Sequence, residues 1–153
     1  MLDVWIIELV EESKWNHPMV VQDKKGGEVR ICVDLGKLND VCLHDPFPKP
    51  FTDEVLEGVG GQEMYSFTDD FSGYHHIGIA KEDCHKTTFI TEWGCFQYTV
   101  MSFGLKNAPV IFSHVVFIAF KYFIQKFLQA YMDDWTVYGL IRDHLGNLRL
   151  MLE

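Results

Sequence analysis

The chain has 153 residues and a formal net charge of −9, and 48% of its residues are apolar and 14% aromatic. This length and composition allow one domain with a real core and exclude a disordered polar segment. The charge excludes a protein that only coats nucleic acid, because phosphate binding requires lysine and arginine, so a nucleic-acid role must rest on local basic residues or on metal ions that reverse the local charge.

Cysteine usage and apolar patterning indicate an intracellular protein. The four cysteines form no Cys-x-x-Cys pair, which disfavours a zinc ribbon or a redox motif, and reduced thiols are the rule inside cells. Residues 1–13 are acidic and do not form a signal peptide. The most apolar stretch, residues 108–120, is shorter than the roughly 20 residues of a membrane span. We expect a cytoplasmic or nuclear location and no membrane partner.

The first half of the chain is predicted to contain a helix, a β-hairpin and a connector. Residues 2–12 fit a short amphipathic helix. The basic glycine turn KKGGE at residues 24–28 separates two apolar runs, 19–21 and 29–33, which indicates a hairpin. Alternate prolines make residues 44–51 an extended connector.

A short helix and several strands follow the connector. Thr52 is the expected N-cap of the helix, which glycines at positions 58, 60 and 61 end. Residues 64–68 form a predicted strand that runs into the acidic pair Asp69-Asp70. Further strands are predicted at residues 75–80, 86–93 and 95–101.

Two helices and one more strand complete the chain. Asn107 as cap and Pro109 in the first turn predict a helix that runs to about residue 126, with its Phe and Ile side chains in the core. Residues 130–138 are β-prone, and residues 142–153 are predicted to be helical. The whole pattern predicts an α+β fold, with antiparallel strands and helices packed on one face.

Asp133 and Asp134 interrupt the β-prone segment QAYMDDWTVYG with two like charges. Burial of an unpaired carboxylate is costly, so such groups are normally hydrated, paired or bound to a metal. A hairpin turn accommodates aspartate, but the usual Asp-Gly signal is absent here. From these residues alone, a turn and a metal site remain equal alternatives.

A second acidic strand end and one basic cluster favour phosphate chemistry. If Asp69 lies on a strand next to Asp133 or Asp134, the carboxylates can share Mg²⁺, which prefers oxygen ligands. Two such ions about 4 Å apart polarise an attacking hydroxyl and a leaving phosphate oxygen. Lys24, Lys25 and Arg30 could close over a triphosphate. The alternatives are two independent solvated turns and an ordinary solvated hairpin tip.

Several motifs in order resemble one family. YSFTDDFSGYHHIGIAKED, KTTFITEWGCFQYTVMSFGLKNAP and YMDDWTVY are similar to the fingers and palm of a reverse transcriptase, an RNA-directed DNA polymerase, of gypsy-type LTR retrotransposons, and most like plant members. The resemblance covers nearly the whole chain. It implies a single domain over residues 1–153, with fingers at roughly 15–60 and part of 75–105, and palm at roughly 61–74 and 106–153.

The resemblance implies a role for each matching residue. Asp69, Asp133 and Asp134 match the catalytic metal-binding acids. Tyr74 matches the aromatic residue under the incoming sugar that excludes a 2′-hydroxyl. The remaining implied nucleotide-binding residues are Lys24, Lys25 and Arg30 on the triphosphate, and Phe103 and Gly104 beside the nucleotide and template. Asp70, His75 and His76 are not expected to be ligands.

The implied reaction is attack of a primer 3′-hydroxyl on a deoxynucleoside triphosphate, directed by an RNA or DNA template. Two Mg²⁺ ions would serve as cofactors, with Mn²⁺ as a possible substitute. In an intact element, thumb and ribonuclease H segments of the same polyprotein would be partners, and the enzyme would reside in a virus-like particle.

Some residues depart from the family pattern. Ser102 replaces the proline that usually precedes Phe-Gly-Leu, and Gly36 and His114 stand where related sequences often carry a basic residue. No thumb or ribonuclease H segment is recognisable. These departures leave a second hypothesis open: a truncated, catalytically inactive retroelement relic, or a protein-interaction module. A third, another two-metal phosphoryl-transfer enzyme on a palm-like fold, is disfavoured by the KKGG hairpin and the FGLKNAP loop.

Overall fold

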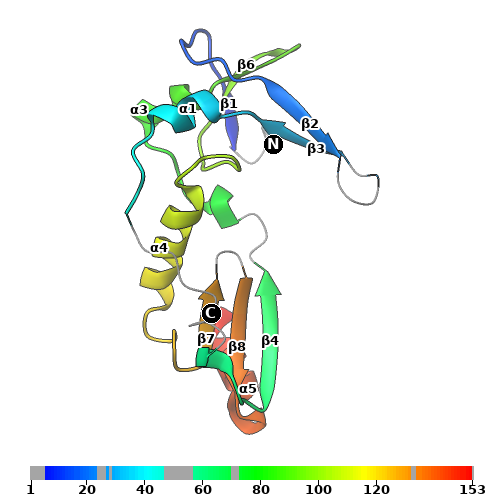
Figure 1. Cartoon of the computed structure of the whole chain (residues 1–153), viewed down its shortest axis with the longest axis vertical. Coiled ribbons are helices and arrows are strands. Elements are labelled where there is room, and N and C mark those ends of the chain that lie inside the picture. Colours follow the sequence, from blue (N-terminus) through cyan, green and yellow to red (C-terminus); the bar gives the residue numbers. More distant parts are fainter. Residues whose placement is uncertain are drawn as a thin grey trace. The chain divides into compact units, whose positions relative to one another are not determined.

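The computed structural model describes residues 6–23, 27, 29–46, 57–69, 73–131 and 134–152. The chain divides into two compact units. Unit 1 comprises Met1–His44 and Tyr74–Ala108, and unit 2 comprises Asp45–Gly73 and Pro109–Glu153. Figure 1 gives the labels of the helices and strands within each unit.

Unit 1 contains two small antiparallel sheets. The first has the strand order β1-β6-β5, and the second pairs β2 with β3. The strands are β1 (Ile7–Leu9), β2 (Met19–Asp23), β3 (Val29–Val33), β5 (Phe89–Thr91) and β6 (Gly94–Tyr98). The predicted hairpin is therefore confirmed, with Gln22 opposite Arg30.

The core of unit 1 joins its two sheets and includes Leu35, which follows β3. Val33, Leu35, Phe89 and Phe96 form a buried cluster, and Leu105 packs against it. Burial of such side chains stabilises the fold by roughly 1.5–3 kcal/mol each. The short helices of this unit are α1 (Gly36–Val41) and α3 (Lys81–Cys84), with 3₁₀ turns at Gly73–His76 and His85–Thr87.

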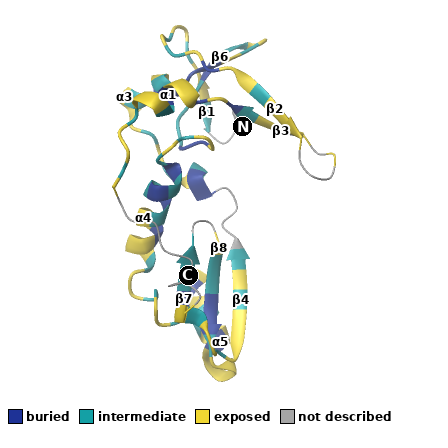
Figure 2. Cartoon of the chain, viewed as in Figure 1, coloured by how far each residue is buried: buried dark blue, intermediate teal, exposed yellow. Residues whose placement is uncertain are grey.

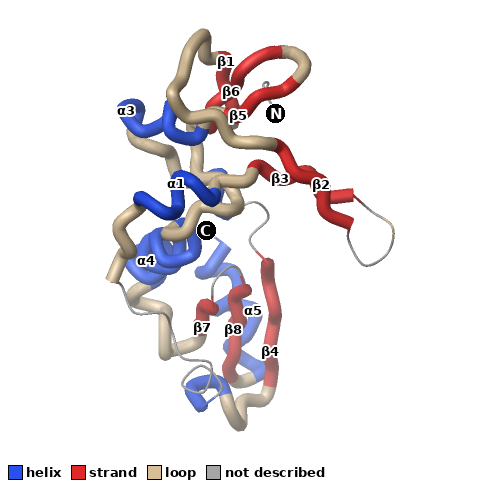
Figure 3. The backbone as a smooth tube through the Cα atoms, turned by 45° about the horizontal axis from the view of Figure 1, so that its top comes forward, coloured by secondary structure: helices blue, strands red, loops and turns tan. Residues whose placement is uncertain are grey.

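Unit 2 is a three-stranded antiparallel sheet with the order β4-β8-β7, covered on one face by helix. Figure 3 shows α5 along this sheet. The elements are β4 (Met64–Asp69), β7 (Leu128–Tyr131), β8 (Asp134–Gly139), α4 (Ala108–Phe120) and α5 (Ile141–Leu152). This arrangement confirms the α+β prediction.

The core of unit 2 joins the sheet to α5. Leu128, Val137 and Met151 are buried together, and the ring of Phe120 meets Trp135 edge-on at 5.0 Å. The buried His144 on α5 is hydrogen-bonded through Nε2 to Ser66 Oγ on β4, at 2.8 Å. In Figure 2, part of the central strand β8 is drawn as buried, where Val137 and Tyr138 lie.

The edge of this sheet differs from its centre. Among the described residues, β4 pairs only with β8. Phe67 on β4 is 79% exposed, and its ring stacks on Tyr65. On its other side, β4 has no strand partner within the part of the chain that the structure describes, and exposed apolar side chains lie beside that edge.

Three predicted elements in unit 1 are wrong in whole or in part. The N-terminal helix is instead β1, because Ile6 and Val10 form backbone hydrogen bonds with Thr99 and Cys95, and this pairing outweighs helical periodicity. Residues 75–80 form no strand. A 3₁₀ turn ends at His76 and α3 begins at Lys81, so the segment between them makes only one isolated bridge, from Gly78 to Val100.

The remaining corrections in unit 1 concern strand length. The strand predicted for residues 86–93 is only β5, because residues 85–87 form a 3₁₀ turn in which the Thr87 and Thr88 hydroxyls donate to the carbonyls of Cys84 and His85. These local hydrogen bonds compete with extension. The strand predicted for residues 95–101 is confirmed over most of its length as β6.

Two predictions in unit 2 also need correction. The helix that begins at Ala108 ends at Phe120 and not near residue 126, because the chain must turn back into β7; Gln125 has a positive φ of 66° in that turn. Its apolar residues are not all in the core, since Phe117 is 51% and Ile118 57% exposed. The predicted N-cap Thr52 lies outside the described residues, whereas the C-terminal helix is confirmed as α5.

Candidate functional site

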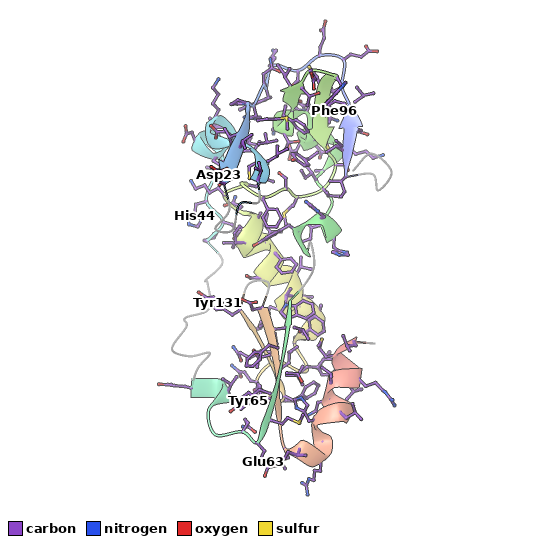
Figure 4. The ribbon with its side chains drawn as sticks, turned by 90° about the vertical axis from the view of Figure 1, so that its right-hand side faces the viewer. Asp23, His44, Glu63, Tyr65, Phe96 and Tyr131 are labelled. Carbon is purple, nitrogen blue, oxygen red and sulfur yellow. The ribbon has the colours of Figure 1, made fainter. Side chains whose placement is uncertain are left out.

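The acidic strand ends of unit 2 meet at one end of the sheet. In the β4–β8 ladder Asp69 is the partner of Asp134, and in the β7–β8 ladder Asp134 is the partner of Tyr131. Directly opposed residues of antiparallel strands are neighbours about 4.5–5.5 Å apart. Figure 4 labels Tyr131 at this end of the sheet and Glu63 at the other. Sequence positions far apart thus supply one acidic sheet end.

The segment around Asp133 and Asp134 is a hairpin and not one strand. Tyr131 and Asp134 are the last paired residues of β7 and β8, so Met132 and Asp133 link the two strands. This pairing shows a hairpin of β7 and β8 in which Asp134 is a strand residue, and Asp133 lies outside the described residues. It does not remove the metal interpretation, because the β4–β8 ladder makes Asp69 and Asp134 partners at this end of the sheet.

The donor set at this sheet end suits a hard divalent cation. Asp134 is exposed, and carboxylate oxygens are the donors that Mg²⁺ prefers. Within the described residues no group of three or more His, Cys, Asp or Glu side chains comes together. Asp133, Asp70 and the side chain of Asp69 lie outside that description.

The predicted nucleotide-binding residues of unit 1 form an aromatic cluster. Tyr74 is buried, and its ring meets Phe103 edge-on with 5.0 Å between centroids. His75 contacts the same ring at 6.0 Å. Burial, and then the neighbouring His76, lower the pKa of His75 from its ordinary value, so this imidazole is neutral at pH 7.

Gly104 follows Phe103 with a φ of +96°, a conformation that favours glycine. A Cβ added there would lie 3.5 Å from the Val33 carbonyl oxygen and 4.0 Å from Leu35. The loop therefore lies close against the junction of β3 and α1.

The side chains of two asparagines bind residues at this loop. The sequence analysis expected Asn107 to cap a helix, and it did not identify Asn39 at all. Asn39 on α1 bonds to Gly104 and Lys106, and Asn107 donates to the Leu43 carbonyl at 2.7 Å. The sequence signal that could have pointed to Asn39 is an asparagine near the end of a short helix, because its amide can both donate and accept hydrogen bonds.

The basic residues are less completely placed. Arg30 lies on β3, but its side chain, Lys24 and Lys25 are outside the described residues. The structure thus brings together Asp69 with Asp134 in unit 2, and Tyr74 with Phe103 and Gly104 in unit 1.

Residues 22–152 match the family model described as reverse transcriptase (RNA-dependent DNA polymerase), and the chain belongs to this family. An RNA-directed DNA polymerase homolog of Oenothera berteroana is 31% identical over 129 residues, which cover 82% of this chain and 91% of that protein. The retrovirus-related Pol polyprotein from transposon opus of Drosophila melanogaster is 35% identical over 92% of the chain. The polyprotein from transposon gypsy of the same fly is 30% identical over 92%.

The chain spans only 14–15% of the length of these two polyproteins. Among solved structures, a foamy viral protease-reverse transcriptase in complex with double-stranded DNA has a TM-score of 0.88 over 98% of this chain and 26% of that one. Its sequence identity is 21%, so this likeness establishes the fold. The α+β architecture of a reverse transcriptase fingers-palm region is thereby confirmed.

Proposed function

We propose that this chain is the nucleotidyltransferase part of a retrotransposon reverse transcriptase, which adds deoxynucleotides to a primer 3′ end. The observation that carries the proposal is the strand register that makes Asp69 and Asp134 partners. Family membership supports the same conclusion. The template is RNA or DNA, and the solved foamy viral relatives were captured with double-stranded DNA and with an RNA/DNA hybrid.

Asp69, Asp133 and Asp134 would hold two Mg²⁺ ions, for which Mn²⁺ is a substitute. When bound, such ions polarise the attacking hydroxyl and the leaving phosphate oxygen. A chain of net charge −9 repels the phosphates of a nucleotide. Cations held by the carboxylates at the sheet end would offset the repulsion between these acids and a triphosphate.

The residues of unit 1 would bind and orient the nucleotide. Tyr74 lies against the deoxyribose, where its ring leaves no room for a 2′-hydroxyl, and Phe103 and Gly104 border the nucleotide and template. Arg30, with Lys24 or Lys25, pairs with the triphosphate, since guanidinium and ammonium groups form strong charge-assisted hydrogen bonds with phosphate. Most of the rate enhancement would then come from positioning and charge stabilisation.

In this proposal unit 1 corresponds to most of the fingers and unit 2 to the palm, with residues 45–60, expected in the fingers, falling in unit 2. Thumb and ribonuclease H segments of a longer polyprotein would complete the enzyme and grip the duplex. The site of action is the cytoplasm or nucleus, within a virus-like particle for an intact element. No helix among the described residues is long and apolar enough to cross a membrane.

Calorimetric titration of the chain with Mg²⁺ and a deoxynucleoside triphosphate tests the proposal. The wild type should give metal-dependent nucleotide binding, and Asp133→Asn should lose most of that signal because one carboxylate is gone. Asp143→Asn, an exposed acid on α5, is the matched control and should bind like the wild type. An equal signal from wild type and Asp133→Asn would overturn the metal site.

A protein-interaction module without catalysis is the second candidate. The observation in its favour is the exposed apolar surface at the end of α4 and in the following turn. Val115, Phe117, Ile118 and Tyr122 are 45–67% exposed, and such patches often mark contact sites. Primer extension on an RNA template, with the thumb supplied by a gypsy-type polyprotein segment, separates the two. Activity excludes the inactive relic, and its absence favours the module.

A further inference from the structure

The side chain of Asn39 makes two hydrogen bonds to one loop. Its Nδ2 donates to the Gly104 carbonyl at 2.7 Å, and its Oδ1 accepts the Lys106 backbone N–H at 2.8 Å. The two partners fix the orientation of the amide, because a carbonyl can only accept and an N–H can only donate. One side chain therefore holds the loop on both sides of Leu105.

We call these two hydrogen bonds of Asn39 the clamp. The helix that carries Asn39 is anchored in the core of unit 1. Asn39 lies on α1 between the buried Leu38 and the end of the helix, and its own N–H donates to the carbonyl of the buried Leu35 at 2.9 Å. Leu105, between the two clamped positions, packs on the core cluster of unit 1. The clamp thus ties the loop to a helix that is anchored by buried side chains.

The exposed part of the loop at Phe103 is not held by burial. Phe103 is 57% exposed, so packing alone does not fix its ring. The Oγ of Ser102 is buried without a hydrogen-bond partner among the described residues, so this hydroxyl does not anchor the loop. The position of Phe103 therefore depends on the backbone at Gly104, whose carbonyl Asn39 binds, together with the ring contact to Tyr74.

The ring of Phe103 in turn limits Tyr74. Their rings meet edge-on at 5.0 Å, and Tyr74 is only 7% exposed. A shift of the loop would widen or narrow the space beside the Tyr74 ring. A small displacement of a positioning group can change selectivity strongly because the contacts that discriminate substrates are short-ranged.

We propose that Asn39 is a positioning residue that sets, through Phe103, how strictly the Tyr74 site distinguishes a deoxyribonucleotide from a ribonucleotide. The inference rests on the proposed function, since it concerns the same nucleotide site. Asn39 itself touches no substrate. It holds the Gly104 carbonyl and the Lys106 N–H, and the aromatic pair transmits that position to the sugar.

Two variants separate the two hydrogen bonds. Asn39→Asp keeps the acceptor for the Lys106 N–H but places an acceptor against the Gly104 carbonyl, whereas Asn39→Ala removes both bonds. Asn16→Asp, an exposed asparagine of the same unit, makes the same charge change and is the control. The measurements are hydrogen exchange at the Lys106 amide, thermal unfolding, and calorimetric affinities for dATP and ATP with Mg²⁺.

The clamp predicts a distinct result for each variant. The Lys106 amide should exchange faster in Asn39→Ala and stay protected in Asn39→Asp. Both variants should reduce the ratio of dATP to ATP affinity by roughly three- to tenfold, the range expected for one lost hydrogen bond. Asn16→Asp should change neither quantity.

Two outcomes would overturn the inference alone. One is an unchanged affinity ratio in both Asn39 variants while wild type binds dATP. The other is an equal fall in dATP and ATP affinity with a lower unfolding temperature, which would show a merely structural role. Wild type that binds no nucleotide with Mg²⁺ would instead overturn the proposed function, and this inference with it.

Discussion

The two candidate regions are built by different forces. In unit 2 the backbone ladders of β4, β8 and β7 place Asp69 opposite Asp134, so no side chain is needed to bring these positions together. In unit 1 the loop around Gly104 is held by the side chain of Asn39 and by an aromatic contact. The acidic sheet end should therefore tolerate substitution without moving, whereas the aromatic cluster should shift when a single side chain changes.

The largest expected effect tests the first half of this comparison. Asp69→Asn should reduce Mg²⁺-dependent dNTP binding by more than about 100-fold, because even residues that only support metal ligands cost 10–100-fold when changed. The fold should persist, since the ladder uses backbone groups. Calorimetry and far-ultraviolet circular dichroism measure the two quantities together. Loss of the circular dichroism signal would show that the carboxylate supports the sheet, contrary to the comparison.

Core deletion should sharpen the distinction between the units. Leu128 is fully buried in the core of unit 2, and Leu128→Ala should lower the free energy of unfolding by about 2–5 kcal/mol. Leu145→Ala, at a position that is 73% exposed on α5, should change it by less than about 0.5 kcal/mol. Urea unfolding measures both. Similar values for the two variants would contradict the assigned core.

The smallest expected effect compares one buried tyrosine in each unit at alkaline pH. Burial raises the pKa of Tyr98 in unit 1 and of Tyr138 in unit 2; for Tyr98, nearby Cys32 adds to the shift. Because the unfolded chain ionises first, stability is unaffected below the ordinary tyrosine pKa and falls as pH rises toward the raised values.

Substitution by phenylalanine checks this pH dependence. Tyr98→Phe and Tyr138→Phe should each flatten part of the alkaline decline in urea-unfolding free energy, and spectrophotometric titration should show one fewer late-ionising phenol in each. Tyr122→Phe, which removes an exposed hydroxyl, should leave the decline as in wild type. A decline that none of the three substitutions alters would assign it to other groups.

Local patterns predicted the elements whose partners are close in sequence. The hairpin of β2 and β3 and helix α5 follow from turn residues and helical periodicity, and both are confirmed. β1 was missed because its strand character arises from pairing with β6, far along the chain. The early end of α4 was missed because the turn at Gln125 has no glycine to signal it.

The residues of the candidate site also differ in whether the sequence could identify them. Asp69 and Asp134 could be singled out because carboxylates at strand ends are conspicuous, and the family resemblance implied that they act together. Asn39 was not predicted as a site residue, since its role depends on where the loop at Gly104 lies in space. A hydrogen bond between positions that are distant in sequence leaves no periodic signal.

The edge of β4 that lacks a strand partner among the described residues has a practical consequence for the purified chain. A strand that pairs on one side only among the described residues, and that carries an exposed Phe67, is where two copies can join into a continuous sheet. Mutual repulsion between molecules of net charge −9 opposes this joining, and salt weakens that repulsion. Low ionic strength should therefore keep the material in solution, and concentrated salt should favour its precipitation.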